Sequence, residues 1–288
     1  MTSWQLRSRT LSWTPMPRIM GIVNTTPDSF SDGGRCILPG DAIDHALRLE
    51  DAGADILDIG GESTRPYSEP VPGDEELRRV MPVIEKLHTR TRLPISIDTS
   101  KARVARAAIE AGAEIINDVT GLAGDSQMPE VAATSRVGVC AMHMQGTPQT
   151  MQDAPMYQDV VDDILHYLSD RSRVLIDTGI ARGSIVLDPG IGFGKTHDHN
   201  LRLLREVRRF HALGFPILVG HSRKGFIAKT LGNKEIDRDP GTLGVSLALA
   251  LAGIQVIRVH QVAIHRQAFQ LFEASGGLDR NDLPKAPD

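Results

Sequence analysis

Eight short apolar runs alternate with longer stretches of helical periodicity along the 288 residues of this chain. These runs are rich in β-branched and aliphatic residues and cover 19–23, 56–59, 95–97, 115–116, 138–142, 185–187, 217–219 and 256–259. Strands that are apolar on both faces are typical of a parallel sheet covered by helices, and the connections are long enough for crossover helices. Eight such units predict an α/β protein with a closed (β/α)8 TIM barrel.

Helical periodicity between the runs supports the same architecture. The apolar positions are Val160, Ile164, Leu165 and Leu168 in one helix and Leu203, Val207 and Phe210 in another. Each set occupies one helical face that can be buried against the sheet. Gly53, Gly112 and Gly214 stand just before predicted strands, where helices are expected to end.

We expect a single domain, because no Pro/Ser-rich linker or low-complexity tract divides the chain. The barrel is assigned to residues 18–277, with an N-terminal extension at 1–17 that should form a flap and a C-terminal tail at 278–288. The extension lacks an apolar run of signal-peptide length. The most apolar stretch, 243–257, is shorter than the roughly 18 residues of a membrane span and is predicted to lie in the core.

Charge and cysteine content narrow the choice of partners. Lys and Arg number 32 against 36 Asp and Glu, a net charge of −4, which argues against a general surface for nucleic acid or anionic membranes. We therefore expect small-molecule partners, with no nucleic acid and no membrane. Cys36 and Cys140 are too few for a disulfide framework and lack metal-ligand spacing, which indicates free thiols in a reducing cytoplasm.

Polar residues stand at the carboxyl ends of five predicted strands, where the chemistry lies in a barrel of this kind. They are Asn24, Asp98, Asn117, Asp188, Arg258 and His260. A helix cap or a loop hydrogen bond could explain any one of them. It does not explain why several converge on the face that holds a central pocket, so a binding site is the better interpretation.

Asp98, Asn117 and Asp188 can together hydrogen-bond a flat heterocycle that offers an amidine-like NH and NH2 edge. A ligand with several donors also offsets the desolvation of buried carboxylates. A glycosidase pair is the competing interpretation of two acids. It is disfavoured because no sugar-stacking aromatics stand beside these residues in the sequence.

The remaining polar groups favour an anion. Ser222, Arg223 and Lys224 follow the seventh predicted strand, and Arg258 and His260 belong to the end of the eighth. The loops after these two strands frequently form a phosphate site in this fold, and Arg and Lys suit phosphate oxygens. An exposed basic cluster is the alternative.

The metal expected beside such an anion is Mg rather than Zn. His143, His221 and His260 lack the spacing of a zinc site. A hard Mg ion could bridge Asn24, water and phosphate oxygens.

Two long Gly/Pro-rich loops, 24–40 and 60–74, border the same face. Both exceed the roughly 4–6 residues of an ordinary connection. Long loops on a catalytic face usually act as lids, with a simple exposed insertion as the alternative.

Two long motifs resemble the signatures of the dihydropteroate synthase family. Residues 21–34 read Gly-Ile-Val-Asn-Thr-Thr-Pro-Asp-Ser-Phe-Ser-Asp-Gly-Gly, and residues 58–66 read Asp-Ile-Gly-Gly-Glu-Ser-Thr-Arg-Pro. Shorter matches follow in the family's order at 96–99, 116–119, 142–148, 187–195, 220–224 and 258–260. Together they span nearly the whole predicted barrel.

The resemblance implies a transferase of folate biosynthesis. It would condense 6-hydroxymethyl-7,8-dihydropterin diphosphate with 4-aminobenzoate, giving 7,8-dihydropteroate and diphosphate, with Mg as cofactor. The resemblance also implies a homodimer through outer helices near the C-terminus, at which the Ala/Leu-rich stretch 243–252 hints.

Family roles carry over to positions of this sequence that match the motifs. The implied pterin ligands and pocket walls are Asp98, Asn117, Asp188, Lys224, Met142, Phe193 and Gly220. The implied diphosphate ligands are Arg258, His260 and, through Mg, Asn24. The implied aminobenzoate and loop-closure residues are Phe30, Thr64, Arg65, Pro66 and Ser222, with Thr64 also near pterin diphosphate. The implied catalytic residues are Asp98, Asp188, Lys224, Arg258 and His260.

An SN1-like substitution is our hypothesis for the mechanism. Mg, Arg258 and His260 would neutralise the departing diphosphate, while Asp98 and Asp188 would stabilise positive charge spreading into the pterin. The aniline nitrogen of 4-aminobenzoate is neutral at pH 7 and can attack without a dedicated base. If the loops must close to build the aminobenzoate pocket, pterin diphosphate should bind first.

Gln261 departs from the pattern, because the family usually has Asp after the motif His. We expect this change to alter the pKa or tautomer of His260 at most.

Two rival functions share parts of this pattern. A methyltetrahydrofolate-type methyltransferase would share the pterin ligands but lack the anion site at 222–224 and 258–260. A non-catalytic pterin-binding paralogue would have lost loop residues, yet Asn24, Asp28, Phe30, Thr64 and Arg65 are all present.

Overall fold

Eight parallel strands form a closed barrel in the computed structural model, which describes residues 2–26 and 39–278. The strands are β3 (Arg18–Asn24), β4 (Ile56–Gly60), β5 (Ile95–Asp98), β6 (Ile115–Asp118), β7 (Gly138–Met142), β8 (Ile185–Asp188), β9 (Leu218–Val219) and β10 (Val256–Val259). Their order is β8-β7-β6-β5-β4-β3-β10-β9, and a parallel bridge between Leu187 and Ile217 joins β8 to β9. The predicted (β/α)8 barrel and its eight strands are confirmed.

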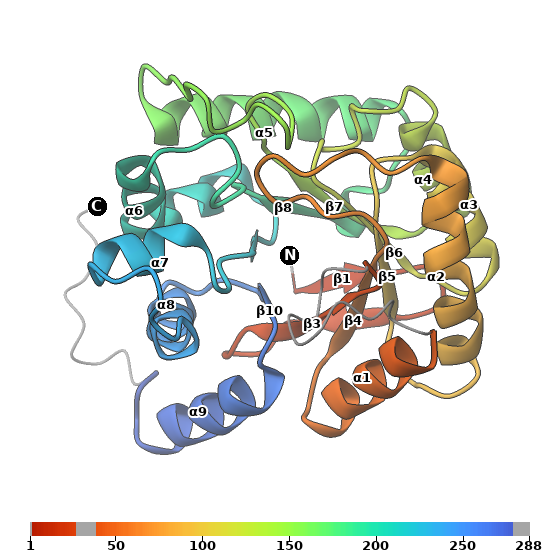
Figure 1. Cartoon of the computed structure of the whole chain (residues 1–288). Helices are drawn as coiled ribbons and strands as arrows, with labels where there is room; N and C mark the ends of the chain where they lie inside the picture. The colour runs from red at the N-terminus through yellow and green to blue at the C-terminus, as the bar shows by residue number, and fades with distance from the viewer. Residues whose placement is uncertain (1, 27–38, 279–288) are drawn as a thin grey trace.

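Helices surround this barrel (Figure 1). They are α1 (Pro39–Asp51), α2 (Gly73–His88), α3 (Ala102–Glu110), α4 (Met128–Ser135), α5 (Val160–Asp177), α6 (His197–Arg205), α7 (Gly225–Thr230), α8 (Asp239–Leu251) and α9 (Val262–Ala274), with short 3-10 turns η1 (Arg182–Ser184) and η2 (Val207–Leu213). Val160, Ile164 and Leu168 of α5 are buried as predicted. Among the helices that the structure describes, none is long and apolar enough to cross a membrane.

The prediction of one helical face through Leu203, Val207 and Phe210 is wrong in its secondary structure. The α-helix ends at Arg205, and the chain continues as the 3-10 turn η2. All three side chains are nevertheless buried. Spacings of four and three residues fit either winding, so the apolar pattern could not reveal the break.

The glycines before the strands have the conformation that the sequence indicated. Gly53, Gly112 and Gly214 have φ values of 93°, 115° and 71°. At Gly112 a Cβ atom would lie 2.2 Å from Nδ1 of His88, so a side chain is excluded there by space as well as by φ.

An N-terminal hairpin closes one end of the barrel. Strands β1 (Ser3–Gln5) and β2 (Thr10–Ser12) pair in antiparallel fashion, and the fully buried Trp4 donates from Nε1 to the carbonyl of Ser184 at 2.8 Å. Trp4 and Leu6 share a hydrophobic cluster with Met20, Ile56, Ile115, Cys140, Val186, Leu218 and Val256. Most of these lie at or near the first residues of their strands, so the hairpin lies opposite the carboxyl ends that carry the predicted site.

Candidate functional site

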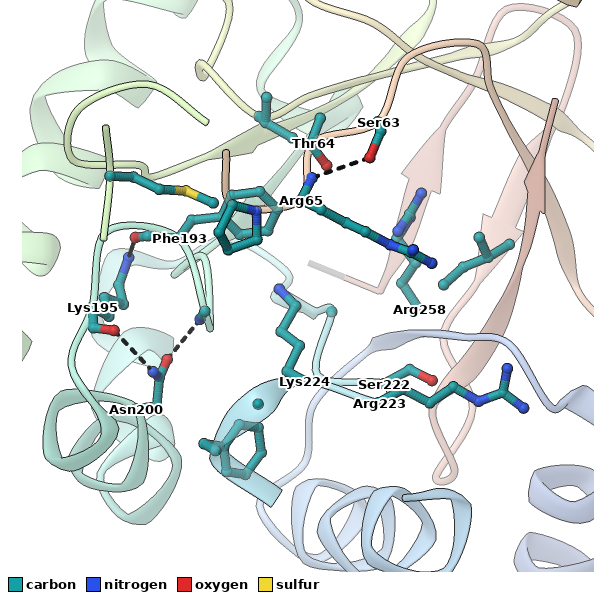
Figure 2. A pocket seen from close by; sticks show the side chains of 18 of the residues that line it. Ser63, Thr64, Arg65, Phe193, Lys195, Asn200, Ser222, Arg223, Lys224 and Arg258 are labelled. Carbon is teal, nitrogen blue, oxygen red and sulfur yellow. Dashed lines mark hydrogen bonds between the residues drawn. The ribbon is translucent and has the colours of Figure 1, made fainter. Parts of the chain in front are cut away.

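A cavity of about 1040 Å³ opens at the carboxyl ends of the strands. Its lining includes Asn24, Thr64, Arg65, Pro66, Asp98, Asn117, Met142, Asp188, Phe193, Gly220, Ser222, Lys224, Arg258 and His260. These are all the predicted site residues except Phe30, which lies outside the described residues, as does most of the first long loop. Figure 2 shows how several of these side chains surround the cavity.

Arg258 is held between two carboxylates on the cavity floor. Its Nε donates to Oδ2 of Asp58 and its Nη2 donates to Oδ2 of Asp98, each at 2.6 Å. Asp58 is fully buried and also accepts a bond from Nδ2 of Asn117 at 3.1 Å. Strands β4, β5, β6 and β10 therefore contribute to one polar network at the end of the barrel.

Burial and neighbouring charges shift both sides of this network. Burial raises the pKa of Asp98 to about 7, with Arg258 acting against the shift and Asp58 adding to it. Burial alone would lower the pKa of Arg258, but the charges of Asp58 and Asp98 raise it above its usual value. Arg258 is therefore a permanent cation, while Asp98 can change charge near neutral pH.

Asp188 lies at the end of β8 with 5% of its surface exposed. Its Oδ1 accepts a bond from the backbone N–H of Gly190 at 2.7 Å. Burial raises its pKa, and the Gly190 bond and the cations of Lys224, Lys195 and Arg258 oppose that shift. The carboxylate is thus oriented from one side and faces the cavity with acceptor capacity to spare.

The glycine-rich loop 190–194 is bound by side chains from several elements. The carbonyl acceptors and their donors are Ile191 with Lys224, Gly192 with Gln152, Phe193 with Lys195, and Gly194 with Tyr157. Gly192 N–H also donates to Oδ1 of Asn200 at 2.6 Å. A loop with so many bonded backbone groups is a rigid support for the Phe193 side chain.

Lys224 reaches across the cavity to this loop. Its Nζ lies 4.1 Å from the centroid of the Phe193 ring, and Figure 2 shows the side chain pointing toward that ring. Burial lowers the pKa of Lys224 to about 7, partly offset by Asp188. The protonation state of Lys224 near neutral pH therefore depends on what occupies the cavity.

Lys195 is a second buried lysine in the cavity wall, with 2% of its surface exposed. Its Nζ lies 3.0 Å from Nδ1 of His143 and donates to the carbonyl of Phe193 at 2.8 Å. Burial lowers the pKa of Lys195 well below its usual value and, together with the Lys195 charge, lowers that of His143 to about 3. The neutral imidazole can therefore accept a bond from the Lys195 amino group.

Ser222 and His260 join the loops after β9 and β10. The Ser222 hydroxyl lies 2.9 Å from Nδ1 of His260 and accepts the backbone N–H of His260 at 3.3 Å. Burial, followed by the charges of Arg223 and Arg258, lowers the pKa of His260 to about 3. If the hydroxyl donates to Nδ1 of the neutral ring, the ring proton lies on Nε2.

Arg223, which the sequence suggested as an anion-binding cation, lines the cavity but has its guanidinium paired with an acid. Its guanidinium makes two bonds of 2.7 Å to the carboxylate of Asp239, and its side chain points away from Lys224 in Figure 2. The residue has a φ of 57°, a left-handed conformation that turns its side chain away from that of its neighbour.

The second long loop is fixed at its base by a buried ion-pair group. Lys101 Nζ lies 2.6 Å from carboxylate oxygens of both Glu62 and Glu76, and Glu76 is fully buried. Farther along, the N–H of Tyr67 donates to the carbonyl of Pro148 at 2.9 Å. Arg65 extends from this loop toward Arg258 in Figure 2. The loop thus brings Thr64, Arg65 and Pro66 to the cavity as predicted, although lid movement remains a prediction.

Asn24 is the residue expected to hold a metal. Its side chain lines the cavity, and within the described residues no group of three or more His, Cys, Asp or Glu side chains is arranged to chelate an ion. An amide oxygen suits Mg, which commonly binds few protein ligands and takes the rest from substrate phosphates and water. The residues therefore fit a Mg ion that binds together with a phosphorylated ligand.

Sequence reasoning missed Asp58, Lys195 and His143 as members of the site. Asp58 had a usable signal, because a lone acid between Leu57 and Ile59 in a fully apolar strand needs a partner when buried. Lys195 follows a glycine-rich run and has the sequence context of an exposed loop residue, so its burial depends on the fold.

Comparisons with known sequences agree with this geometry. The family described as "Pterin binding enzyme" matches residues 20–260. The dihydropteroate synthase of Escherichia coli K12 is 44% identical over 265 residues, covering 92% of this chain and 94% of that protein. The dihydropteroate synthase of Synechocystis is 41% identical over 263 residues, covering 91% of each.

Solved structures are similar over the same range. Dihydropteroate synthase of Xanthomonas albilineans with 4-aminobenzoic acid has a TM-score of 0.88 at 44% identity, covering 95% of this chain and 98% of that one. The Yersinia pestis enzyme in a sulfonamide drug complex has a TM-score of 0.89 at 41% identity, covering 96% and 99%. The Burkholderia cenocepacia enzyme with 7,8-dihydropteroate has a TM-score of 0.87 at 39% identity, covering 97% and 98%.

Proposed function

The chain belongs to the dihydropteroate synthase family of pterin-binding enzymes, and from this we propose that it condenses 6-hydroxymethyl-7,8-dihydropterin diphosphate with 4-aminobenzoate. The products are 7,8-dihydropteroate and diphosphate, which makes the protein a transferase of folate biosynthesis. The residue roles, the metal and the mechanism are part of the same proposal.

The observation that carries the proposal is the contact between Asp98 and Arg258 within one cavity. Asp98 belongs to the group that suits a flat heterocycle, and Arg258 belongs to the group that suits an anion. Because the two groups of residues are in contact, a ligand that binds to both has a hydrogen-bonding ring joined by a short link to a negatively charged group. Pterin diphosphate has this form.

Asp98, Asn117 and Asp188 are the proposed acceptors for the donor edge of the pterin, with Met142, Phe193 and Gly220 as walls. Lys224 is proposed to turn from the Ile191 carbonyl to the oxo and ring-nitrogen side of the pterin. Burial lowers the pKa of Lys224 to about 7, and a ligand oxygen at this position would favour the protonated lysine.

Arg258 and His260 are the proposed ligands of the diphosphate. Asp58 and Asp98 occupy Nε and Nη2 of Arg258, so Nη1 is the nitrogen that we expect to meet a phosphate oxygen. His260 is proposed to present Nε2–H, with the Ser222 hydroxyl donating to its Nδ1. Both donors are oriented before the reaction, so they can stabilise charge that grows on the leaving group.

Asn24 is proposed to hold Mg together with the diphosphate. The ion would supply charge neutralisation for the leaving group. Its support here is the fit between an amide oxygen in the cavity wall and the ligand preference of Mg.

The proposed reaction is SN1-like. Departure of diphosphate leaves a benzylic-type cation conjugated with the pterin, and the carboxylates of Asp98 and Asp188 at the ring edge stabilise that charge. The neutral aniline nitrogen then attacks the cationic carbon and loses its extra proton to water, so this chain's residues need only position the amine. Thr64, Arg65, Pro66 and Ser222 are the proposed aminobenzoate contacts, and Phe30 remains predicted for the same role. Sulfonamide drugs are expected to compete there, as the complex of the Yersinia pestis relative supports.

A homodimer and a cytoplasmic location complete the proposal. The exposed Leu271 of α9 and the partly buried Leu247 of α8 place apolar surface on the outer helices near the C-terminus. Cys140 is a buried free thiol, which suits a reducing compartment. Sedimentation analysis would test the dimer.

The test of the function is release of diphosphate by the purified protein with Mg and pterin diphosphate, with and without 4-aminobenzoate. Release that depends on 4-aminobenzoate and yields dihydropteroate is the expected result. Tight pterin binding without that product would refute the synthase and favour a non-catalytic pterin-binding protein.

A further inference from the structure

A chain of buried polar side chains lies behind the cavity wall that Ser222 and His260 form. It consists of His221 in the loop after β9, Ser246 in α8 and His265 in α9, whose exposed fractions are 0%, 0% and 1%. None of the three lines the cavity, so none is placed to touch a ligand there.

Hydrogen-bond distances link the three residues continuously. Nε2 of His221 lies 2.8 Å from the Ser246 hydroxyl, and that hydroxyl lies 3.0 Å from Nε2 of His265. Nδ1 of His265 lies 2.6 Å from the carbonyl oxygen of Gln261. Nε2 of His221 is also 3.1 Å from the carbonyl of Thr242.

One arrangement of protons completes the links between these residues when both rings are neutral, in competition with a bond of 3.0 Å from the Ser246 hydroxyl to the Thr242 carbonyl. The Gln261 carbonyl can only accept, so His265 carries its proton on Nδ1 and its Nε2 is an acceptor. In that arrangement the Ser246 hydroxyl donates to Nε2 of His265 rather than to the Thr242 carbonyl, and its oxygen accepts Nε2–H from His221. Burial supports neutral rings, because it lowers the pKa of His221 to about 4 and also lowers that of His265.

The two ends of this series of hydrogen-bonded groups are next to Ser222 and His260 in the sequence. His221 directly precedes Ser222, and Gln261 directly follows His260. The loops after β9 and β10 are therefore connected twice, at the front through the Ser222 and His260 side chains and at the back through this chain.

We propose that His221, Ser246 and His265 are positioning residues for diphosphate recognition, because they hold the Ser222 and His260 loops in the register that keeps the Nε2–H of His260 directed at the ligand. The inference rests on the proposed function. A network that serves only the core would affect folding stability. A positioning network affects the binding of diphosphate more than the binding of 4-aminobenzoate.

The first test is imidazole tautomer assignment by ¹⁵N NMR on the unmodified full-length protein. The expected result is Nδ1–H for His265 and Nε2–H for both His221 and His260. Protonation of His265 on Nε2 instead would overturn the inference without affecting the proposed function.

The second test uses Ser246→Ala, with Ser246→Thr to restore the hydroxyl. Ser172→Ala is the matched control, because Ser172 is also a buried helical serine and donates to the carbonyl of Ser169 at 2.8 Å in α5. Calorimetry measures binding of inorganic diphosphate with Mg, and steady-state kinetics give a KM value for each substrate.

We expect Ser246→Ala to weaken diphosphate binding and raise the pterin diphosphate KM about fivefold, the equivalent of the roughly 1 kcal/mol of one buried hydrogen bond. The aminobenzoate KM in this variant and both KM values in Ser172→Ala should change less than about twofold, and Ser246→Thr should restore most of the binding. Equal changes in the two KM values, or none, would overturn the inference. If the unmodified protein binds no diphosphate, both this inference and the proposed function are refuted.

Discussion

Replacing Arg258 by Met should destabilise the protein in a pH-dependent way. Arg258 separates two carboxylates, with bonds of 2.6 Å to both Asp58 and Asp98. Methionine keeps an unbranched side chain but leaves the carboxylates without a counter-charge. Breaking a buried ion pair from one side costs about 3–5 kcal/mol, and the low end applies because 21% of the Arg258 side chain is exposed.

The sign of the pH effect follows from Asp98. The pKa of Asp98 is about 7 in the folded protein, compared with an ordinary value of 3.8. The folded state therefore binds the proton more tightly than the unfolded state, and the protein loses stability as the pH rises from 3.8 to about 7. Arg258 is the main group that keeps this pKa from rising further. In the variant the pKa should therefore be higher, and the extra loss should grow as the pH rises above about 7, where Asp98 ionises in the parent protein.

Thermal unfolding at pH 5 and pH 8 tests this reasoning. At pH 8 we expect a loss of about 3 kcal/mol, or a Tm lower by about 6 °C for a chain of this size. At pH 5 the loss should be smaller, because Asp98 is protonated in both proteins. The double variant Arg258→Met, Asp98→Asn should recover part of the loss at pH 8. Equal losses at both pH values would refute the electrostatic account.

Three other features give predictions of their own. Trp4→Ala should lower stability by about 4 kcal/mol and Tm by about 8 °C in a thermal melt, with kcat at 25 °C unchanged, because the residue is buried at the closed end of the barrel. Lys195→Met should lower kcat/KM for 4-aminobenzoate about tenfold, because Lys195 donates a hydrogen bond to the Phe193 carbonyl. A Tm within about 2 °C of the parent value would exclude general unfolding as the cause. In calorimetry, 4-aminobenzoate should bind only when Mg diphosphate is present; tight binding alone would contradict ordered binding.

The barrel could be predicted because its determinants are local. Each strand is a short apolar run, and a parallel barrel places all carboxyl ends on one face. Asp98, Asn117 and Asp188 could therefore be assigned to one cavity without knowledge of any contact. The break in the helix at Arg205 could not, since both windings bury the same apolar side chains.

The partners of the charged residues could not be predicted, because they depend on distant parts of the chain. Asp58 and Arg258 are 200 residues apart in sequence and neighbours on the barrel floor. Arg223 likewise was assigned to an anion, whereas the fold brings Asp239 to its guanidinium. Local sequence supplies the type of charge at a position, and the closure of the barrel decides whether that charge remains available to a ligand.

Gln261 illustrates the same division between local and distant effects. An Asp at this position, the N-cap of α9, could accept a bond from the first turn of the helix, and Gln261 makes no such side-chain bond. The side chain of Gln261 is exposed, whereas its carbonyl accepts from the buried His265. Ser222 Oγ contacts Nδ1 of His260, and burial, Arg223 and Arg258 lower the pKa of this ring. In the proposed positioning role, the residue at 261 therefore contributes through its backbone carbonyl, which any side chain at this position would leave in place.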